Sequence, residues 1–217
     1  LKDRYLLLIA AFSVVFTLVN TNAEYVKDEL IAQLATEAGA AQGLSAAEIN
    51  DLRTSLIGGF YTAVNIGGVI LQSFAVSRIV KHLGLRRAFL VLPAIAMLDA
   101  AAIAFIPLWS VVRFTKIAEN AADYSLNNTL RGMLWLPTSR RAKYLAKQAV
   151  DSFAVRLGDV SSSLFVLLLA GVMGLGVRAF GIANLGLVFV WLWLARAIGR
   201  EHEARASRRA AEEAAAP

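Results

Sequence analysis

A stripe of ionisable and amide side chains runs along one apolar segment of this sequence, residues 111–135. Its members recur every three or four residues, and they are Arg113, Lys116, Asn120, Asp123, Asn127 and Arg131. At about 100° per residue, this spacing places them on one face of an α-helix. A charge among apolar residues costs free energy unless it meets a partner or a polar cavity. We therefore predict that this face lines a polar cavity that admits a charged solute.

Three further segments carry polar groups of the same kind. Residues 149–173 place Arg156 and Asp159 on one face, residues 55–77 place Asn65 and Gln72 on one face, and Glu24 ends the first apolar segment. Cations suit an anionic solute, because arginine presents a planar fork to phosphate or carboxylate. We predict three roles: cations that contact the anion (Arg113, Lys116, Arg156), acids that balance charge (Glu24, Asp123, Asp159) and amides that donate hydrogen bonds (Asn65, Gln72, Asn120, Asn127).

Ion pairing is the alternative interpretation of these charges. An acid one turn away, such as Glu119 for Lys116 or Asp159 for Arg156, neutralises each cation and merely holds helices together. For the whole stripe the cavity is favoured, because a purely structural bundle could use leucine and alanine at less cost.

The elements that carry these residues are expected to be transmembrane helices. The chain is 58% hydrophobic, well above a soluble domain, and its apolar runs are long enough to cross a bilayer. We predict an all-α membrane protein whose domain, residues 1–199, is a six-helix bundle that forms one half of a major-facilitator-type fold. The predicted spans are 5–26, 55–77, 88–109, 111–135, 149–173 and 176–198.

Basic residues predict the orientation of the bundle. They gather in 78–87, in 131–147 and in the tail 200–217, whereas the 27–52 stretch is acidic. By the positive-inside rule, both termini are expected in the cytoplasm, with a bacterial inner membrane as the location. The net charge of +6 is thus attributed to basic cytoplasmic loops beside the lipid bilayer. No nucleic-acid partner is expected.

The 27–52 stretch is expected to form an outer loop. Apolar residues recur in it at helical spacing, and Ser45 with Glu48 matches a capping box that would start a short helix leading into the second span. We predict a lid of two short helices on the outer face, or else a simple connector.

Catalytic and cofactor motifs are absent from the sequence. It has no cysteine, and it contains neither His-Glu-x-x-His nor Gly-x-Ser-x-Gly nor a nucleotide-binding P-loop. The sequence therefore predicts a protein that is not an enzyme, that binds no cofactor or metal, and that does not hydrolyse ATP itself.

Three short runs carry a resemblance to a known family. They are Asp123-Tyr-Ser-Leu-Asn-Asn-Thr-Leu-Arg-Gly-Met-Leu-Trp-Leu-Pro137, then Lys143-Tyr-Leu-Ala-Lys147, then Val150-Asp-Ser-Phe-Ala-Val-Arg-Leu-Gly158. They resemble the C-terminal half of the ATP/ADP translocases of plastids and obligate intracellular bacteria. Gly84, Arg86 and Arg87 also match part of a cytoplasmic loop of major facilitator transporters. The chain departs from the translocases at Gly132, where they favour Glu, and at Asp159, where they favour Lys.

The resemblance implies a secondary transporter half that exchanges a small anionic solute, such as ATP or ADP, by alternating access. Its partners would be the lipid bilayer, the solute and a second six-helix half, in the same chain or in a partner chain. A different class stays open from the residues alone: a non-transporting membrane subunit or scaffold, in which the polar stripe binds a protein or holds the bundle together.

Overall fold

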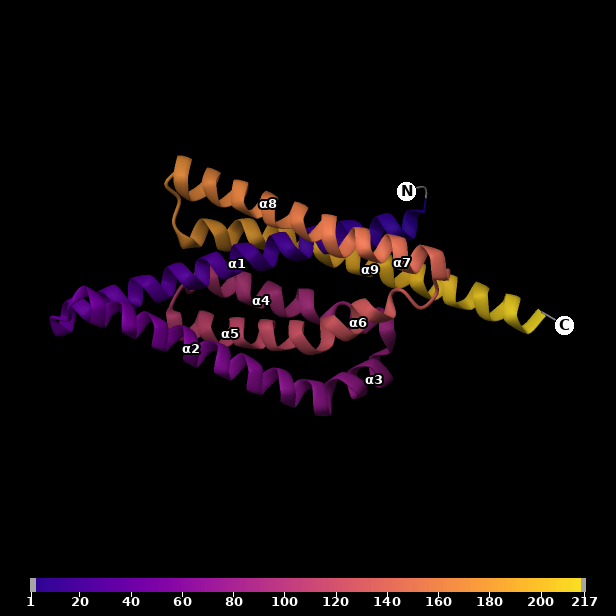
Figure 1. Ribbon diagram of the computed structural model, residues 1–217, viewed down its shortest axis with the longest axis horizontal. Coiled ribbons are helices and arrows are strands. Elements are labelled where there is room, and N and C mark those ends of the chain that lie inside the picture. The colour runs from indigo at the N-terminus through magenta and orange to yellow at the C-terminus, as the bar shows by residue number, and fades with distance from the viewer. Residues whose placement is uncertain (1–2, 216–217) are drawn as a thin grey trace.

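A computed structural model describes residues 3–215 and consists of helices that run back and forth along one long axis (Figure 1). Short turns divide these residues into six helical rods. In chain order they are α1 (Arg4–Gln42); α2, η1 and α3 (Ala46–Ile70, Leu71–Ala75, Val76–Ala88); α4 (Val91–Phe105); α5, η2 and α6 (Trp109–Ala122, Asp123–Asn127, Asn128–Met133); α7, η3, α8 and η4 (Arg140–Ala149, Val150–Ala154, Val155–Val166, Leu167–Val172); and α9 (Val177–Ala215).

The expected lid over 27–52 is wrong. Residues 27–42 continue α1 as one uninterrupted helix, in which Leu30, Ile31 and Ala35 are buried. The chain reverses only at Gly43, whose φ of 66° is left-handed and suits glycine. The apolar spacing of this stretch correctly indicated a helix, but the helix is the end of the first rod and not a separate cover.

The predicted capping box is confirmed at the start of α2. The Ser45 side chain accepts a hydrogen bond from the Glu48 backbone N–H, and the Glu48 carboxylate accepts one from the Ser45 N–H at 2.8 Å. Two N–H groups that the first turn would leave unpaired are thereby satisfied. The turn and the cap together make α1 and α2 a tight helical hairpin, at the left-hand tip of Figure 1.

In the part of the chain that the structure describes, four helical stretches are long and apolar enough to cross a membrane: Arg4–Gln42, Ala46–Ala88, Lys143–Val172 and Val177–Arg209. Of the other two rods, α4 is apolar but has only 15 residues, and the rod α5–η2–α6 carries the polar stripe. The predicted all-α architecture is therefore confirmed for residues 3–215, and these four stretches suit a membrane protein, whereas six transmembrane spans and the major-facilitator arrangement remain predictions.

Of the four π-helical segments in residues 3–215, three contain polar residues. In η1, η2 and η3 each backbone hydrogen bond spans five residues and not four, so the helix is locally wider. The face presented by the helix after such a segment is therefore rotated relative to the face presented before it. The stripe on residues 111–135 passes through η2, so its two ends do not share one continuous face.

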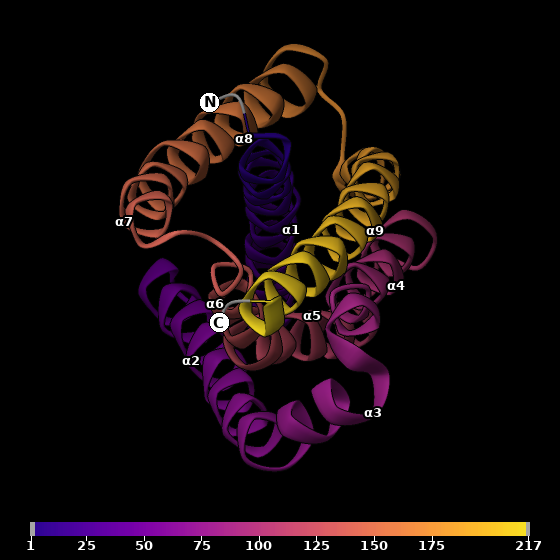
Figure 2. The ribbon, with the colours of Figure 1, turned by 90° about the vertical axis from the view of Figure 1, so that its right-hand side faces the viewer.

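The hydrophobic core lies between α1, α4 and α9. Here α9 packs against α1 and α4, and the buried Trp191 ring contacts the rings of Phe12 and Phe16, with centroids 5.8 and 5.4 Å apart. Seen end-on, α4 and α9 lie on one side of α1, while α8 and α2 stand at the two edges of the opposite side (Figure 2). That opposite side holds the polar residues described below.

The crossing of α4 and α9 depends on Gly181. A Cβ added there would lie 2.4 Å from the backbone nitrogen of Ala104 and 2.8 Å from its Cα. Backbone atoms cannot relieve such a clash by changing rotamer, as a side chain can. We expect Gly181→Ala to lower the free energy of unfolding by about 1–3 kcal/mol, measured by thermal or denaturant unfolding in detergent.

Gly186→Ala is the matched control, because it adds the same methyl group to the same helix with no atom within 4 Å. Its expected effect is neutral or slightly stabilising. Equal stability of the two variants would contradict the close approach of α9 to α4.

Candidate functional site

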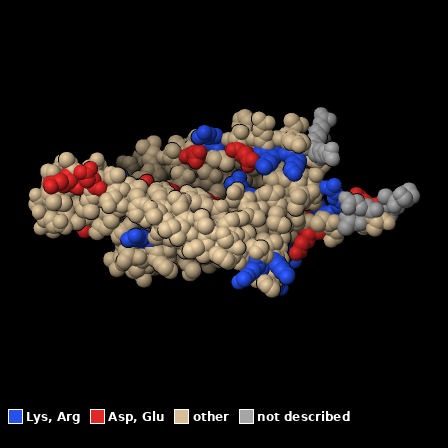
Figure 3. Space-filling model, turned by 60° about the horizontal axis from the view of Figure 1, so that its bottom comes forward, with Lys and Arg blue, Asp and Glu red and all other residues tan. Residues whose placement is uncertain are grey.

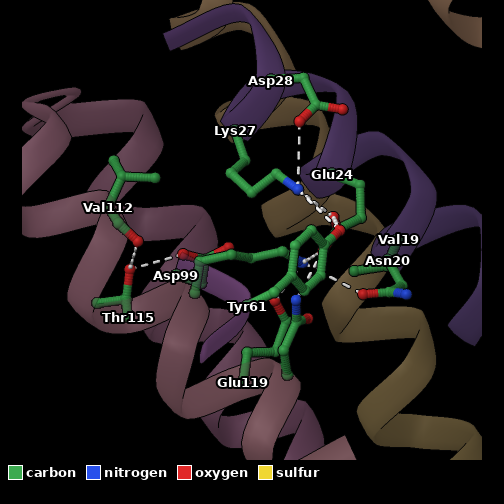
Figure 4. A network of polar contacts seen from close by, with 12 residues as sticks. Val19, Asn20, Glu24, Lys27, Asp28, Tyr61, Asp99, Val112, Thr115 and Glu119 are labelled. Carbon is green, nitrogen blue, oxygen red and sulfur yellow. Dashed lines mark hydrogen bonds and ion pairs between the residues drawn. The ribbon is translucent and has the colours of Figure 1, made fainter. Parts of the chain in front are cut away.

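A buried cluster of charges lies where α1, α2, α4 and α5 meet (Figure 4). At its centre is Lys116, which is wholly buried. Its Nζ lies 2.7 Å from Glu119 Oε2 and 3.3 Å from Glu24 Oε1, and it donates a hydrogen bond to Asn20 Oδ1 at 3.2 Å. Asn120 Nδ2 donates to the same Glu24 oxygen at 2.9 Å. The ammonium group is therefore fully coordinated by protein oxygens.

A second lysine completes the cluster from α1. Lys27 is 1% exposed, and its Nζ lies 2.7 Å from Glu24 Oε2 and 3.2 Å from Asp28 Oδ1. It also donates to the Tyr61 hydroxyl at 3.1 Å and lies 5.0 Å from the centroid of the Phe60 ring. Glu24 thus bridges two buried lysines and ties α1 to α2 and α5.

The predicted contact between Lys116 and a solute has no counterpart in this conformation. Lys116 has no solvent exposure, and Asn120 is 3% exposed, so neither side chain is open to a ligand. Glu119, which the sequence offered as an ion-pair partner, is the acid closest to Lys116. At Lys116 the structure therefore supports the ion-pair interpretation.

A groove lined by polar residues is open on the side between α2 and the α7–η3 segment. It consists of adjoining cavities that share lining residues, with volumes of about 500, 380 and 200 Å³. We call it the polar groove, and its polar lining residues are Ser13, Asn65, Gln72, Ser73, Asp123, Tyr124, Asn127, Asn128, Arg131, Lys147 and Asp151. Many of them come from η1, η2 and η3, so the widened helical turns lie at the groove.

The two ends of the polar groove differ in chemistry. The end beside α2 presents the amides Asn65 and Gln72 and the ring of Tyr124, which is 53% exposed. The other end, beside α7, presents Arg131 and Lys147, and Lys143 lines a further cavity next to it. In the space-filling view, charged side chains border a recess at this level (Figure 3).

Arg131 joins the middle of the groove to its basic end. Its Nη2 lies 3.5 Å from Asp151 Oδ1, and its guanidinium lies 5.6 Å from the centroid of the Phe16 ring. Next to it, Asn127 Nδ2 donates to Asp123 Oδ1 at 2.7 Å. The side chain of Arg131 is 27% exposed, so an anion in the groove can reach it, which is not so for Lys116.

The structure divides the ten predicted site residues into three groups. Glu24, Lys116 and Asn120 belong to the buried cluster, whereas Asn65, Gln72, Asp123 and Asn127 line the polar groove. The remaining three lie outside both groups: Arg113 is exposed on α5, and Arg156 and Asp159 pair with each other on α8 at 3.7 Å.

Sequence reasoning left Tyr124, Arg131, Lys147 and Asp151 out of the predicted site. Arg131 belongs to the polar stripe but received no role among the predicted contacts, and the other three stand in the runs that resemble the translocases. A helical projection could not place them together, because they come from η2, α6, α7 and η3, which only the fold brings side by side.

Comparison with protein families identifies the chain. A family model described as TLC ATP/ADP transporter matches residues 1–202. The chain belongs to the TLC ATP/ADP transporter family. Comparison with curated proteins and with solved structures found no match.

Membership of the TLC ATP/ADP transporter family confirms the resemblance and agrees with the apolar helices. This member is an integral membrane protein of a family of transporters, not of enzymes. Large apolar side chains on its outside, such as Phe105, Phe114 and Phe189, are 62–76% exposed and suit contact with lipid.

Proposed function

We propose that this protein is one half of a secondary transporter that exchanges nucleotides, with the nucleotide held in the polar groove. The observation that carries the proposal is the division of that groove into two chemically different ends. A nucleotide has the same two parts: a flat base with hydrogen-bonding edges, and a polyanionic phosphate chain.

The base is proposed to lie at the end beside α2. Tyr124 offers an exposed ring for stacking, and the amides of Asn65 and Gln72 both donate and accept hydrogen bonds. Stacking of a base on an aromatic side chain contributes about 1–3 kcal/mol.

The phosphates are proposed to lie at the basic end. Arg131 gives a forked donor, and Lys147 and Lys143 give exposed ammonium groups. Asp151 lies 3.5 Å from the Arg131 guanidinium, so an incoming phosphate would exchange one anionic partner of Arg131 for another. A second six-helix half, in the same chain or a partner chain, would cover the groove, and rocking of the halves would give alternating access.

Exchange in proteoliposomes tests this proposal. Purified protein is reconstituted in vesicles loaded with ADP, and entry of labelled ATP is followed. We expect counter-exchange in which Tyr124→Ala raises the KM for ATP roughly tenfold, whereas Tyr124→Phe does not. Phe114→Ala, which removes another exposed ring from the same rod, should leave KM unchanged.

The scaffold remains the second candidate, favoured by the buried charge cluster that holds α1, α2 and α5 together. It predicts a stable complex with another membrane protein and no nucleotide flux. Absence of exchange from correctly folded protein, together with such a complex, would favour it over transport.

A further inference from the structure

A strongly basic pocket lies between α3 and α9, apart from both sites described above. It has a volume of about 530 Å³ and is lined by four arginines, one glutamate and two leucines. Its lining residues are Leu83, Arg86, Arg87, Leu90, Arg196, Arg200 and Glu203. None of them belongs to the polar groove, so nucleotide exchange leaves this pocket unexplained.

The charges of this pocket are only partly neutralised by the protein. Arg86 Nη1 lies 3.3 Å from Glu203 Oε2. Among the side chains that the structure describes, no acid lies within ion-pair distance of Arg87, Arg196 or Arg200, and all three arginines are exposed. A cluster of like charges is unfavourable unless an anion balances them. The clustered arginines therefore favour binding of a negatively charged group in this pocket.

The backbone fixes the arginines in place. Gly84 has φ 71° and ψ 162°, which breaks α3 and turns Arg86 and Arg87 toward α9. On α9, a Cβ at Gly199 would lie 3.2 Å from Arg86 Cα, so the two segments approach closely. The pocket therefore results from a specific crossing of two segments and not from chance clustering on a mobile tail.

The level of the pocket matches a membrane surface. The apolar stretch of α9 ends at Arg196, and Trp193, one turn before it, is 63% exposed. Tryptophan is enriched at the level of lipid headgroups, and its spacing places Trp193 on the same helical face as Arg196 and Arg200. Leu83 and Leu90 add apolar lining beside the arginines.

We propose that this pocket binds the phosphodiester headgroup of an anionic phospholipid, whose acyl chains lie against the apolar flank of α3 and α9. Basic pockets between membrane helices bind such headgroups, and each cation near the surface strengthens binding about fivefold. A free phosphate would need the arginines but neither the leucines nor the exposed tryptophan.

Native mass spectrometry of the delipidated, detergent-purified protein tests this site. Phosphatidylglycerol is titrated against zwitterionic phosphatidylcholine. We expect the wild type to retain phosphatidylglycerol selectively. Arg87→Gln/Arg196→Gln/Arg200→Gln should lower its affinity on the order of 100-fold. The control Arg78→Gln/Lys81→Gln/Arg208→Gln removes the same charge from exposed positions outside the pocket and should change the affinity much less.

Equal loss in both triple variants would overturn the assignment of the pocket. Displacement of phosphatidylglycerol from the wild type by millimolar inorganic phosphate would assign the pocket to a soluble anion and would also overturn the proposal. If the pocket variant does not fold, the wild-type protein still tests the proposal. Equal retention of phosphatidylglycerol and phosphatidylcholine by the wild type would contradict selective binding of an anionic headgroup. Exchange of ATP is not needed for any of these outcomes.

Discussion

Lys116→Met should strongly lower the free energy of unfolding, so that most of the protein no longer folds. The expected cause is lost stability and not loss of a substrate contact. The substitution removes a wholly buried cation and leaves Glu119 and one oxygen of Glu24 without their neutralising partner. Removal of one partner from a buried ion pair costs about 3–5 kcal/mol. Unfolding in mixed detergent micelles would measure the loss.

Two companion variants separate this cause from others. Lys116→Met/Glu119→Gln removes the pair together and should recover a large part of the stability, because Glu24 keeps Lys27 as its partner. Arg156→Met removes a cation from an ion pair of the same spacing whose arginine is 84% exposed, and should cost under about 1 kcal/mol. A Lys116→Met protein that is fully stable but binds no nucleotide would show that Lys116 contacts the substrate.

Arg131→Gln should lower the kcat/KM for ATP exchange by about 10–100-fold while the protein stays folded. The side chain is partly exposed and lines two adjoining cavities of the polar groove. A hydrogen bond to a charged group contributes about 1.5–3 kcal/mol, and glutamine has neither the charge nor the fork. Initial rates of labelled ATP entry into ADP-loaded proteoliposomes would give the effect.

Arg131→Lys should fall between the wild type and Arg131→Gln, because it keeps the charge but cannot bind two phosphate oxygens at once. Arg78→Gln is the matched control, since Arg78 is exposed on α3 and lines no part of the groove. Unchanged exchange in Arg131→Gln would remove the phosphate end from the proposed site.

Much of the fold could be predicted from local sequence patterns. Apolar runs indicated the helices, and Ser45 with Glu48 indicated the start of α2, because both signals depend on residues within a few turns. The lid could not be distinguished from a continued helix in this way. The helical spacing of Leu30 and Ile31 fits a separate short helix and a continuation of α1 equally well. The only signal in favour of a continued helix was that no helix-breaking residue precedes Gly39.

The site was predicted by residue type but not by depth. The stripe on α5, η2 and α6 passes through two environments, because Lys116 is wholly buried, whereas Asp123 lines the groove. A helical projection shows direction and not which neighbouring helix covers each turn. The π-helical turn in η2 adds a shift of face that no residue pattern signalled.

Occupation of the polar groove by a nucleotide can be measured directly, because the sequence contains no cysteine. Asn128→Cys places one thiol on an exposed position of the groove, and Ser55→Cys places one on an exposed position of α2 away from it. The rate of maleimide labelling is compared with and without ATP in proteoliposomes. We predict that ATP slows labelling of the Asn128→Cys protein and leaves the Ser55→Cys protein unaffected. Labelling at Asn128→Cys that is equally fast with saturating ATP, in protein that exchanges ATP, would show that the nucleotide does not occupy the polar groove.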